Sequence, residues 1–433
     1  MEGLIVVCIV FALIFSLLLI GVPIAFSILS GSIIGLWILG GMKLLEGFFG
    51  YSLHHLMASY PIAVAPMFIL VGILADKSLL GERTYLAFHR LLGALRGGLL
   101  MATTGAAAVF GACCGSSIAS AALFSRVALP ELRKLGYQEE ISLGAIATAG
   151  GLAVLIPPSI MIVFYGILTN VSIGKVLLAG IVPGIFLSLL IMGGIYLRVT
   201  LNPKLAPVSI GRASWREKAS AVVGTWPVLA VFFIIVGGIY CGFFTPTEAG
   251  AFGASIVLVY AVAVGTGPKK LLDAFLETAA LTSQIFILIV GGMMLSKVVT
   301  LSGVTHDILE WMGAANLSLT LIWAIFIVIY LILGAILDPI SMLVLTLPMS
   351  FPILTSLGAS PIALGIVVVL LVEEAVITPP IGFNVYVVAA AADADPAVAF
   401  RGSALFFFVI LIAIVVVIVF PDIATWLPDL AYR

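Results

Sequence analysis

The chain begins with a long apolar segment that carries no charge from residue 3 to residue 42. As a helix rising about 1.5 Å per residue, this segment would extend roughly 60 Å, about twice the hydrocarbon thickness of a bilayer. We therefore expect it to fold back once, near Gly21-Val22-Pro23. No basic segment precedes it, and Glu2 is the only charge nearby, so the pattern does not indicate a cleaved signal peptide.

The same apolar character continues along the chain. Of its 433 residues, 63% are hydrophobic and only 9% are charged, which is too few charges for the surface of a soluble protein of this length. Most of the other uncharged segments have about the 20 residues that a spanning helix requires. A net charge of −1 gives no indication of a nucleic-acid partner. The sequence therefore predicts an all-α polytopic membrane protein surrounded by a lipid bilayer.

Two apolar regions contain interruptions that a simple spanning helix would not tolerate. The window 97–125 has Gly115-Ser116-Ser117 inside it and basic residues beyond both ends, which predicts a re-entrant hairpin that enters and leaves on one side. The region 141–171 contains Pro157-Pro158, which removes two backbone donors and breaks the helix. Such a break is tolerated in a membrane only where it lines a polar cavity or is buried in protein.

These interruptions recur in the second half of the chain at one constant displacement. Pro157-Pro158 corresponds to Pro379-Pro380, and the break at Ser116 corresponds to the one at Asp338-Pro339. Five membrane crossings in each half would leave the two halves inverted relative to each other. We therefore expect an inverted repeat with two re-entrant hairpins and two broken helices, an arrangement typical of secondary transporters with a binding site at the middle of the membrane.

The basic residues test the predicted topology independently. With the N-terminus outside, 15 of the 19 Lys and Arg residues fall on cytoplasmic segments, as the positive-inside rule requires. We therefore predict a multi-pass protein with both termini on the outer, periplasmic face. The predicted cytoplasmic segments are 77–96, 126–140, 198–218, 267–273 and 393–401.

The repeat divides the chain into a predicted scaffold and a predicted transport domain. The transport domain comprises hairpin 1 with its broken helix (97–170) and hairpin 2 with its broken helix (319–392). Amphipathic arms precede each hairpin, at 77–96 and 297–318. The remaining segments are the scaffold helices 1–76, the scaffold helices 171–296 with a cytoplasmic connector at 198–220, and the last helix with the C-terminal tail, 393–433.

Several motifs resemble the large membrane subunit of TRAP (tripartite ATP-independent periplasmic) transporters, the DctM-like family. They are PIAVAPMFILVGIL (61–74), GACCGSSIASAA (111–122), LGAIATAGGLAVLIPPSIMIVFYG (143–166), FFTPTEAGAFGA (243–254) and ITPPIGFNVYV (377–387). The resemblance covers essentially the whole chain.

The resemblance implies Na⁺-driven uptake by an elevator movement in a bacterial inner membrane. It also implies two partners, a small four-helix membrane subunit on a separate chain and a periplasmic substrate-binding protein. The substrate class would be a small organic anion such as a carboxylate, a sialic acid or a sulfonate. The sequence does not identify the substrate within this class, and it predicts no cofactor other than Na⁺ as the coupling ion.

The hairpin tips and helix breaks supply the candidate Na⁺ ligands, because hydroxyls and unpaired backbone carbonyls suit a small dehydrated cation. Small residues at such positions also serve simply to pack helices together, which is the competing interpretation. Facing breaks favour the binding interpretation. The candidate Na⁺-binding residues are Gly115, Ser116, Ser117, Pro157, Asp338, Ser341, Thr378 and Pro379.

The candidate substrate contacts lie between the two tips, where Asn384 offers both a donor and an acceptor. These candidates are Ser117, Pro158, Ser159, Pro380, Gly382 and Asn384. Acidic residues in apolar segments are costly and often functional. The roles of Glu373 and Glu374 stay open between ligand contact and helix capping, whereas Glu248 follows Thr245-Pro246-Thr247 and is interpreted as a helix start.

Two alternative functions make different demands on the sequence. A Na⁺/divalent-anion symporter that works without a binding protein would share the inverted repeat. An intramembrane enzyme would need a Ser/His, paired-Asp or zinc constellation, and no His lies beside Ser116 in the sequence, nor does a second Asp lie in an apolar segment beside Asp338. The four cysteines lie in apolar segments without C-x-x-C spacing, so we predict neither a zinc site nor an enzyme.

Overall fold

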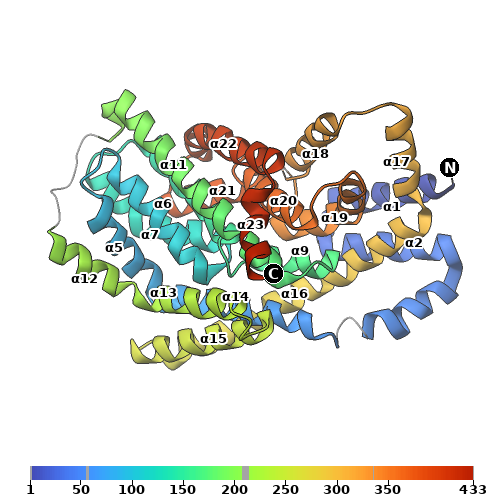
Figure 1. Cartoon of the computed structure of the whole chain (residues 1–433), viewed down its shortest axis with the longest axis horizontal. Coiled ribbons are helices and arrows are strands. Elements are labelled where there is room, and N and C mark those ends of the chain that lie inside the picture. The colour runs from blue at the N-terminus through green and yellow to red at the C-terminus, as the bar shows by residue number, and fades with distance from the viewer. Residues whose placement is uncertain (1, 55–57, 207–213, 335, 433) are drawn as a thin grey trace.

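The computed structural model describes residues 2–54, 58–206, 214–334 and 336–432, and within these ranges every regular element is a helix. Residues 55–57 of the predicted first scaffold segment, residues 207–213 of the predicted connector and residue 335 of hairpin 2 lie outside the described residues, as do both terminal residues. The all-α prediction is confirmed. Figure 1 shows the helices in an elongated arrangement, with the C-terminus near the centre of the view and the N-terminus at one end.

The first half of the chain folds into helices whose ends follow local breakers. The apolar opening segment ends its first helix at Leu19, and the second begins after Pro23, so the predicted fold-back is confirmed. The elements are α1 (Glu2–Leu19), α2 (Ile24–Gly47), η1 (Phe48–Ser52), η2 (Tyr60–Ala63), α4 (Val64–Lys77), α5 (Leu80–Leu92), α6 (Gly98–Cys114), α7 (Ser117–Lys134), α8 (Glu139–Leu155), α9 (Ile160–Thr169), α10 (Ile173–Ala179), α11 (Ile181–Leu201) and η3 (Pro203–Leu205).

In the second half, α16 continues through residues 297–302 and ends at Gly303, which has a φ of 71°. The predicted arm 297–318 therefore contains the end of α16 and the whole of α17. The elements are α12 (Trp215–Gly224), α13 (Trp226–Phe232), η4 (Phe233–Gly237), α14 (Gly238–Tyr240), α15 (Pro246–Ala263), α16 (Pro268–Ser302), α17 (Val304–Ala314), α18 (Leu319–Gly334), α19 (Pro339–Ser356), α20 (Pro361–Ala375), α21 (Phe383–Ala392), α22 (Pro396–Val419) and α23 (Asp422–Ala431).

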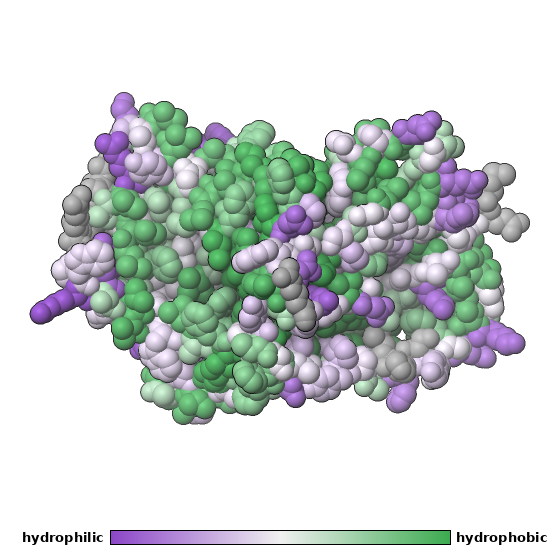
Figure 2. Space-filling view, viewed as in Figure 1, coloured by the Kyte–Doolittle hydropathy of each residue, from purple (hydrophilic) through white to green (hydrophobic). Residues whose placement is uncertain are grey.

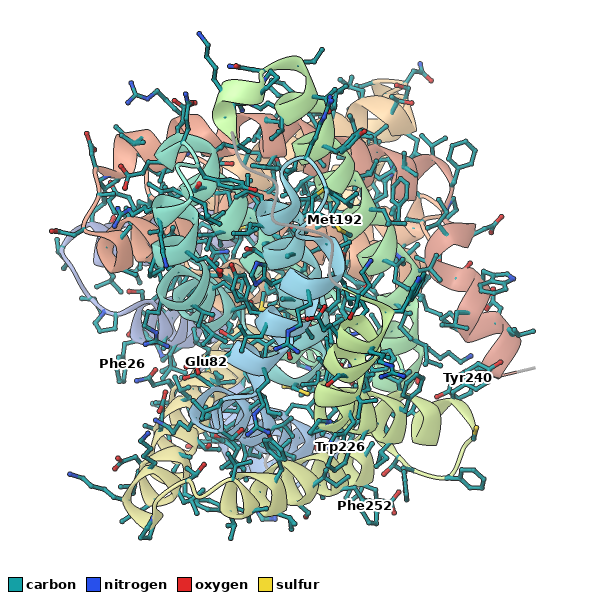
Figure 3. The ribbon with its side chains drawn as sticks, turned by 90° about the vertical axis from the view of Figure 1, so that its left-hand side faces the viewer. Phe26, Glu82, Met192, Trp226, Tyr240 and Phe252 are labelled. Carbon is teal, nitrogen blue, oxygen red and sulfur yellow. The ribbon has the colours of Figure 1, made fainter. Side chains whose placement is uncertain are left out.

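Seven helices among the described residues are long and apolar enough to cross a membrane, or nine if each of two bent helix pairs is one span. Large apolar side chains also lie on the outside: Phe26, Tyr240 and Phe252 are at the rim of the view in Figure 3, and each is exposed. Figure 2 shows hydrophobic residues over much of the visible face, with hydrophilic residues gathered mainly at its ends and edges. Exposed apolar surface of this extent suits a lipid environment.

Helix boundaries repeat at the displacement seen in the sequence. The second arm of hairpin 1, α7 (Ser117–Lys134), has the same length as α19 (Pro339–Ser356). The displacement between the two helices along the chain is the one that separates Ser116 from Asp338. The starts of the following helices, α8 and α20, are related in the same way. Helix α8 bends by 46° into α9 at the first proline pair, and both proline pairs, Pro157-Pro158 and Pro379-Pro380, have cis peptide bonds.

The packing separates two groups of helices. Helix α16 packs along α2 and α4, and α15 packs against α4. Helix α8 is the centre of the other group, because α6, α7 and α22 all pack against it. In Figure 1 the helices α5, α6 and α7 lie on the opposite side of the molecule from α1, α2 and α17, with α9, α20 and α23 between them.

Candidate functional site

The tip of hairpin 1 is formed by residues that permit a tight corner between α6 and α7. Gly115 has a φ of 62°, in the left-handed region that favours glycine. Ser116 then caps α7, because its hydroxyl accepts a hydrogen bond from the Ala119 amide at 3.4 Å. A Cβ on Gly115 would lie 2.9 Å from the Pro158 carbonyl oxygen, so the tip closely approaches the first helix break.

The tip of hairpin 2 is capped by a carboxylate at the corresponding position. Asp338 Oδ1 accepts hydrogen bonds from the amides of Ile340 and Ser341, each at 3.1 Å, and the Ser341 hydroxyl donates to Oδ2. Pro339 follows at the first helical position, where its missing N–H leaves no unmet donor. Asp338 is half-buried, so part of its carboxylate surface stays open beside the cavity described next.

Both tips line one small cavity of about 120 Å³. Three pairs of residues related by the internal repeat line it: Ser116 with Asp338, Ser117 with Pro339, and Ile118 with Ile340. Gly115 and three residues at the first helix break complete the lining. Those three residues are Val154, Ile160 and Met161.

The first helix break lies buried behind the tip. Pro157 and Pro158 are both buried, and Ser159 is fully buried. The Ser159 hydroxyl donates to the Val154 carbonyl and accepts from the Ile162 amide at 3.2 Å, so it caps α9. The Ser159 hydroxyl is therefore hydrogen-bonded to the end of α8 and to the start of α9.

The second break differs from the first in exposure. The Thr378 hydroxyl donates to the Glu374 carbonyl at 2.7 Å, whereas Pro379 and Pro380 are exposed. Gly382 has a φ of 50° and precedes α21. None of these four residues lines the 120 Å³ cavity.

Asn384 lies in the packing between the two halves. Its side chain is fully buried, and its amide nitrogen donates to the Ala147 carbonyl of α8 at 3.1 Å. The structure thus places the predicted site residues in two sets. Gly115, Ser116, Ser117 and Asp338 share the cavity, and Ser341 bonds to Asp338 at the tip of hairpin 2 without lining it. The remaining candidates lie in the breaks and in the helix packing.

Sequence reasoning missed the apolar part of the cavity wall. Ile118 and Ile340 are an equivalent pair of the internal repeat, each two residues after the capping residue of its tip. The displacement itself was therefore the signal that could have identified them. Val154 and Met161 carry no such signal, because they read as ordinary apolar helix residues.

Glu248 is explained by local structure. Its carboxylate accepts hydrogen bonds from both the amide and the hydroxyl of Thr245 at 2.8 Å, while the Thr245 hydroxyl accepts from the Glu248 amide at 3.3 Å. This is a reciprocal capping box at the start of α15. The interpretation of Glu248 as a helix start is confirmed.

Oxygen atoms are the polar groups that the two tips bring to the cavity. The polar lining residues are Ser116, Ser117 and Asp338, beside the backbone at the corners of the hairpins. Such a set suits a hard cation better than a soft metal. Among the described residues, no group of three or more His, Cys, Asp or Glu side chains could hold a metal ion.

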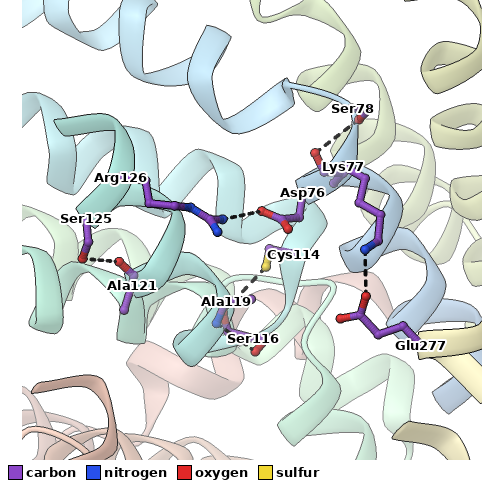
Figure 4. A network of polar contacts seen from close by, with 11 residues as sticks. Asp76, Lys77, Ser78, Cys114, Ser116, Ala119, Ala121, Ser125, Arg126 and Glu277 are labelled. Carbon is purple, nitrogen blue, oxygen red and sulfur yellow. Dashed lines mark hydrogen bonds and ion pairs between the residues drawn. The ribbon is translucent and has the colours of Figure 1, made fainter. Parts of the chain in front are cut away.

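Polar contacts connect hairpin 1 to its neighbours, as Figure 4 shows. Arg126 of α7 pairs with Asp76 of α4 at 3.7 Å, and the adjacent Lys77 pairs with Glu277 of α16 at 2.9 Å. Near the tip, the Cys114 thiol donates to the Ser116 carbonyl at 3.6 Å. The first ion pair therefore joins hairpin 1 to α4, and the second joins α4 to α16.

Curated permeases from several bacteria are similar to this chain. The C4-dicarboxylate TRAP transporter large permease protein DctM of Vibrio cholerae is 30% identical over 98% of each chain. The ectoine TRAP transporter large permease protein TeaC of Halomonas elongata is 32% identical over 96% of this chain and 97% of its own. The isethionate TRAP transporter permease protein DctMQ of Oleidesulfovibrio alaskensis is 30% identical over 78% of this chain, but over only 53% of its own length.

A solved structure shares the fold. The YdaH transporter of Alcanivorax borkumensis superposes with a TM-score of 0.64 over 94% of this chain and 97% of its own, at 13% identity. The family model described as "Tripartite ATP-independent periplasmic transporter, DctM component" matches residues 11–423. The chain therefore belongs to the DctM-component family of tripartite ATP-independent periplasmic transporters.

Proposed function

We propose that this chain is the large membrane subunit of a Na⁺-coupled importer that takes up a small organic anion delivered by a periplasmic binding protein. The single observation that carries Na⁺ coupling is the cavity where both hairpin tips meet, because repeat-related residues bring hydroxyl and carboxylate oxygens to one place. Such oxygens suit a small cation held inside a membrane. The substrate class would be carboxylates, sialic acids or sulfonates.

Two partners are part of this proposal: a periplasmic binding protein and a separate small membrane subunit. The isethionate relative named DctMQ is much longer than this chain, whereas the Vibrio cholerae large permease has nearly the same extent. The separate small subunit is proposed by analogy with the relatives that are named large permease proteins. The family assignment favours dependence on a binding protein over the alternative of a symporter that works alone.

The elevator movement is proposed from the distribution of polar groups. The two tips carry the oxygen atoms of the cavity, so opening one tip alone would expose them to hydrocarbon. Carrying the complete set across the membrane keeps these groups satisfied. The hairpins and broken helices (97–170 and 319–392) would then move as one unit against the scaffold.

Na⁺ coupling is tested by uptake into proteoliposomes that contain this chain with its small subunit and binding protein. Uptake should require an inward Na⁺ gradient and should rise cooperatively with Na⁺ concentration. Replacing external Na⁺ with choline should abolish accumulation. Full accumulation in choline would rule out Na⁺ coupling while leaving the family assignment intact.

The proposed orientation places both termini in the periplasm of a bacterial inner membrane and the connector 198–220 in the cytoplasm. Ser214 is an exposed residue at the start of α12 and suits a test. In a background without the native cysteines, Ser214→Cys should react with a membrane-impermeant maleimide only after the cells are opened. Labelling in intact spheroplasts would contradict the orientation.

A further inference from the structure

Glu373 is a buried carboxylate near the end of α20 that no part of the described chain neutralises. Its side chain is 2% exposed, and both of its oxygens lack a hydrogen-bond partner among the described residues. The ion pairs of the described residues do not include it. A buried, unpaired carboxylate is costly in a membrane protein, so its position calls for a function.

Three helices meet around this carboxylate. A Cβ on Gly151 of α8 would lie 2.6 Å from Glu373 Oε2, so the carboxylate occupies the space that this glycine leaves free. A Cβ on the preceding Gly150 would lie 2.8 Å from the Ser117 carbonyl oxygen. The glycine pair of α8 therefore brings Ser117 of α7 and Glu373 of α20 to the same place.

Ser117 connects Glu373 to the cavity between the tips. Its hydroxyl faces the carboxylate without completing a hydrogen bond of ordinary geometry. Ser117 also lines the cavity, whereas Glu373 does not. The carboxylate thus lies directly behind the part of the wall that Ser117 forms.

The internal repeat explains why hairpin 1 needs a carboxylate from elsewhere. Asp338 gives the tip of hairpin 2 its own negative charge, but the equivalent residue in hairpin 1 is Ser116, which is neutral. Glu373, in turn, is equivalent to Gly151, the residue that it contacts. The second half of the chain therefore supplies a charge that the first half lacks, at the point where the halves meet.

We propose that Glu373 is a positioning residue of the cation site at hairpin 1, and that it acts through Ser117. An ionised Glu373 accepts a hydrogen bond from the Ser117 hydroxyl. This bond orients the lone pairs of the Ser117 oxygen toward the cavity. Its negative charge also offsets the charge of a cation bound there. This inference rests on the proposed Na⁺ coupling and adds to it the residue that supplies the charge at the first tip.

The test measures Na⁺-dependent thermal stabilisation of the purified chain with its small subunit, with K⁺ at equal ionic strength as the reference. Glu373→Gln should raise the Na⁺ concentration for half-maximal stabilisation by about tenfold or more, as expected for the loss of a charge-assisted hydrogen bond. In K⁺ alone, this variant should be at least as stable as the wild type, because it removes a buried charge. A purely structural role would instead lower its stability in K⁺ and leave the Na⁺ dependence unchanged.

Glu374→Gln is the matched control, since Glu374 is an adjacent carboxylate, equally buried and equally without a hydrogen-bond partner among the described residues. The Na⁺ concentration for half-maximal stabilisation of this variant should stay within about twofold of the wild-type value, which is a change in binding free energy smaller than RT. Gly151→Ala keeps the charge of Glu373 but displaces its carboxylate, and it should weaken Na⁺ binding in the same direction as Glu373→Gln.

A double-mutant comparison tests the route through Ser117. If Glu373 acts through Ser117, the loss of Na⁺ affinity in the double variant Ser117→Ala with Glu373→Gln should be clearly smaller than the sum of the two single losses. Fully additive losses would overturn this route. A wild type that Na⁺ does not stabilise over K⁺ would overturn the proposed function and this inference together. Normal Na⁺ dependence in Glu373→Gln would overturn the inference alone.

Discussion

At the residue scale, the cavity between the hairpin tips depends on small and polar side chains at two corners of the chain. Ser116 and Asp338 each cap the helix that follows, and each also lines the cavity. Capping and ligand binding are compatible, because a side-chain oxygen has more than one lone pair. The two roles separate in experiments, since capping acts on stability and ligand binding acts on cation affinity.

Ser116→Ala should therefore reduce the apparent affinity for Na⁺ in uptake assays. Loss of one ligand is expected to cost about 1–3 kcal/mol, the range for leaving a polar partner unsatisfied. Ser125→Ala is the matched control, because the Ser125 hydroxyl donates to the Ala121 carbonyl at 2.7 Å in the same helix, away from the cavity. Equal Na⁺ dependence in the two variants would exclude Ser116 as a ligand.

Gly115→Ala should destabilise the protein by more than a simple change of helix propensity. The left-handed conformation costs roughly 1–2 kcal/mol for a residue with a Cβ, and this Cβ would also press against the Pro158 carbonyl. Thermal unfolding in detergent measures the effect. Gly193→Ala is the control, since it has ordinary backbone geometry and open space around a Cβ. A Gly115→Ala variant as stable as the control would contradict the proposed corner.

At the scale of elements, each helix boundary near the site has a local cause. The arms α7 and α19 begin after a capping Ser or Asp, and α15 begins with the capping box of Thr245 and Glu248. Such boundaries are determined by adjacent residues. They recur at one displacement along the chain because the capping residues recur there. An acidic residue at a boundary is then explained by the helix that it starts.

Glu248→Ala should accordingly lower the thermal stability, because the capping box at the start of α15 loses one of its two partners. Because Glu248 only serves its own helix, the Na⁺ concentration for half-maximal uptake should not change. Thermal unfolding and Na⁺ titration of uptake on the same preparation separate these two effects. A large shift in Na⁺ dependence with unchanged stability would show that Glu248 contacts the transported ions.

At the scale of the whole molecule, the proposed movement is a displacement of the hairpin domain against the scaffold. In the proposed division, α16 is part of the scaffold and α19 is part of the hairpin domain (97–170 and 319–392). They pack closely where a Cβ on Gly292 would lie 3.5 Å from the Val344 Cβ. This distance is within the range that a disulfide bridges. A pair of cysteines at these two positions could therefore crosslink the two units reversibly.

Gly292→Cys with Val344→Cys, in a background lacking the four native cysteines, should abolish uptake when oxidised and recover it when reduced. The control is each single-cysteine variant, Gly292→Cys or Val344→Cys alone in the same background, which cannot form the bridge. Oxidation of this control should leave uptake unchanged. Transport at the reduced rate with the α16–α19 crosslink formed would rule out an elevator movement.

The sequence by itself determined the features that depend on nearby residues. The fold-back near Pro23, the corners of the hairpins, the helix breaks at the proline pairs and the capping role of Glu248 all follow from a few adjacent residues. Apolar length determined the candidate spans in the same way. Even the correspondence between the halves was visible, because breakers and caps recur at one displacement.

Only the tertiary structure decided which of these features meet. Ser116 and Asp338 lie in opposite halves of the chain, yet they line one cavity, while Asn384 is enclosed in packing against α8. Glu373 lies behind Ser117 because Gly151 leaves room for a carboxylate. These contacts join distant segments and depend on the packing of whole helices. Local sequence preferences specify where a helix begins or breaks. The packing of whole helices determines which residues surround a buried side chain.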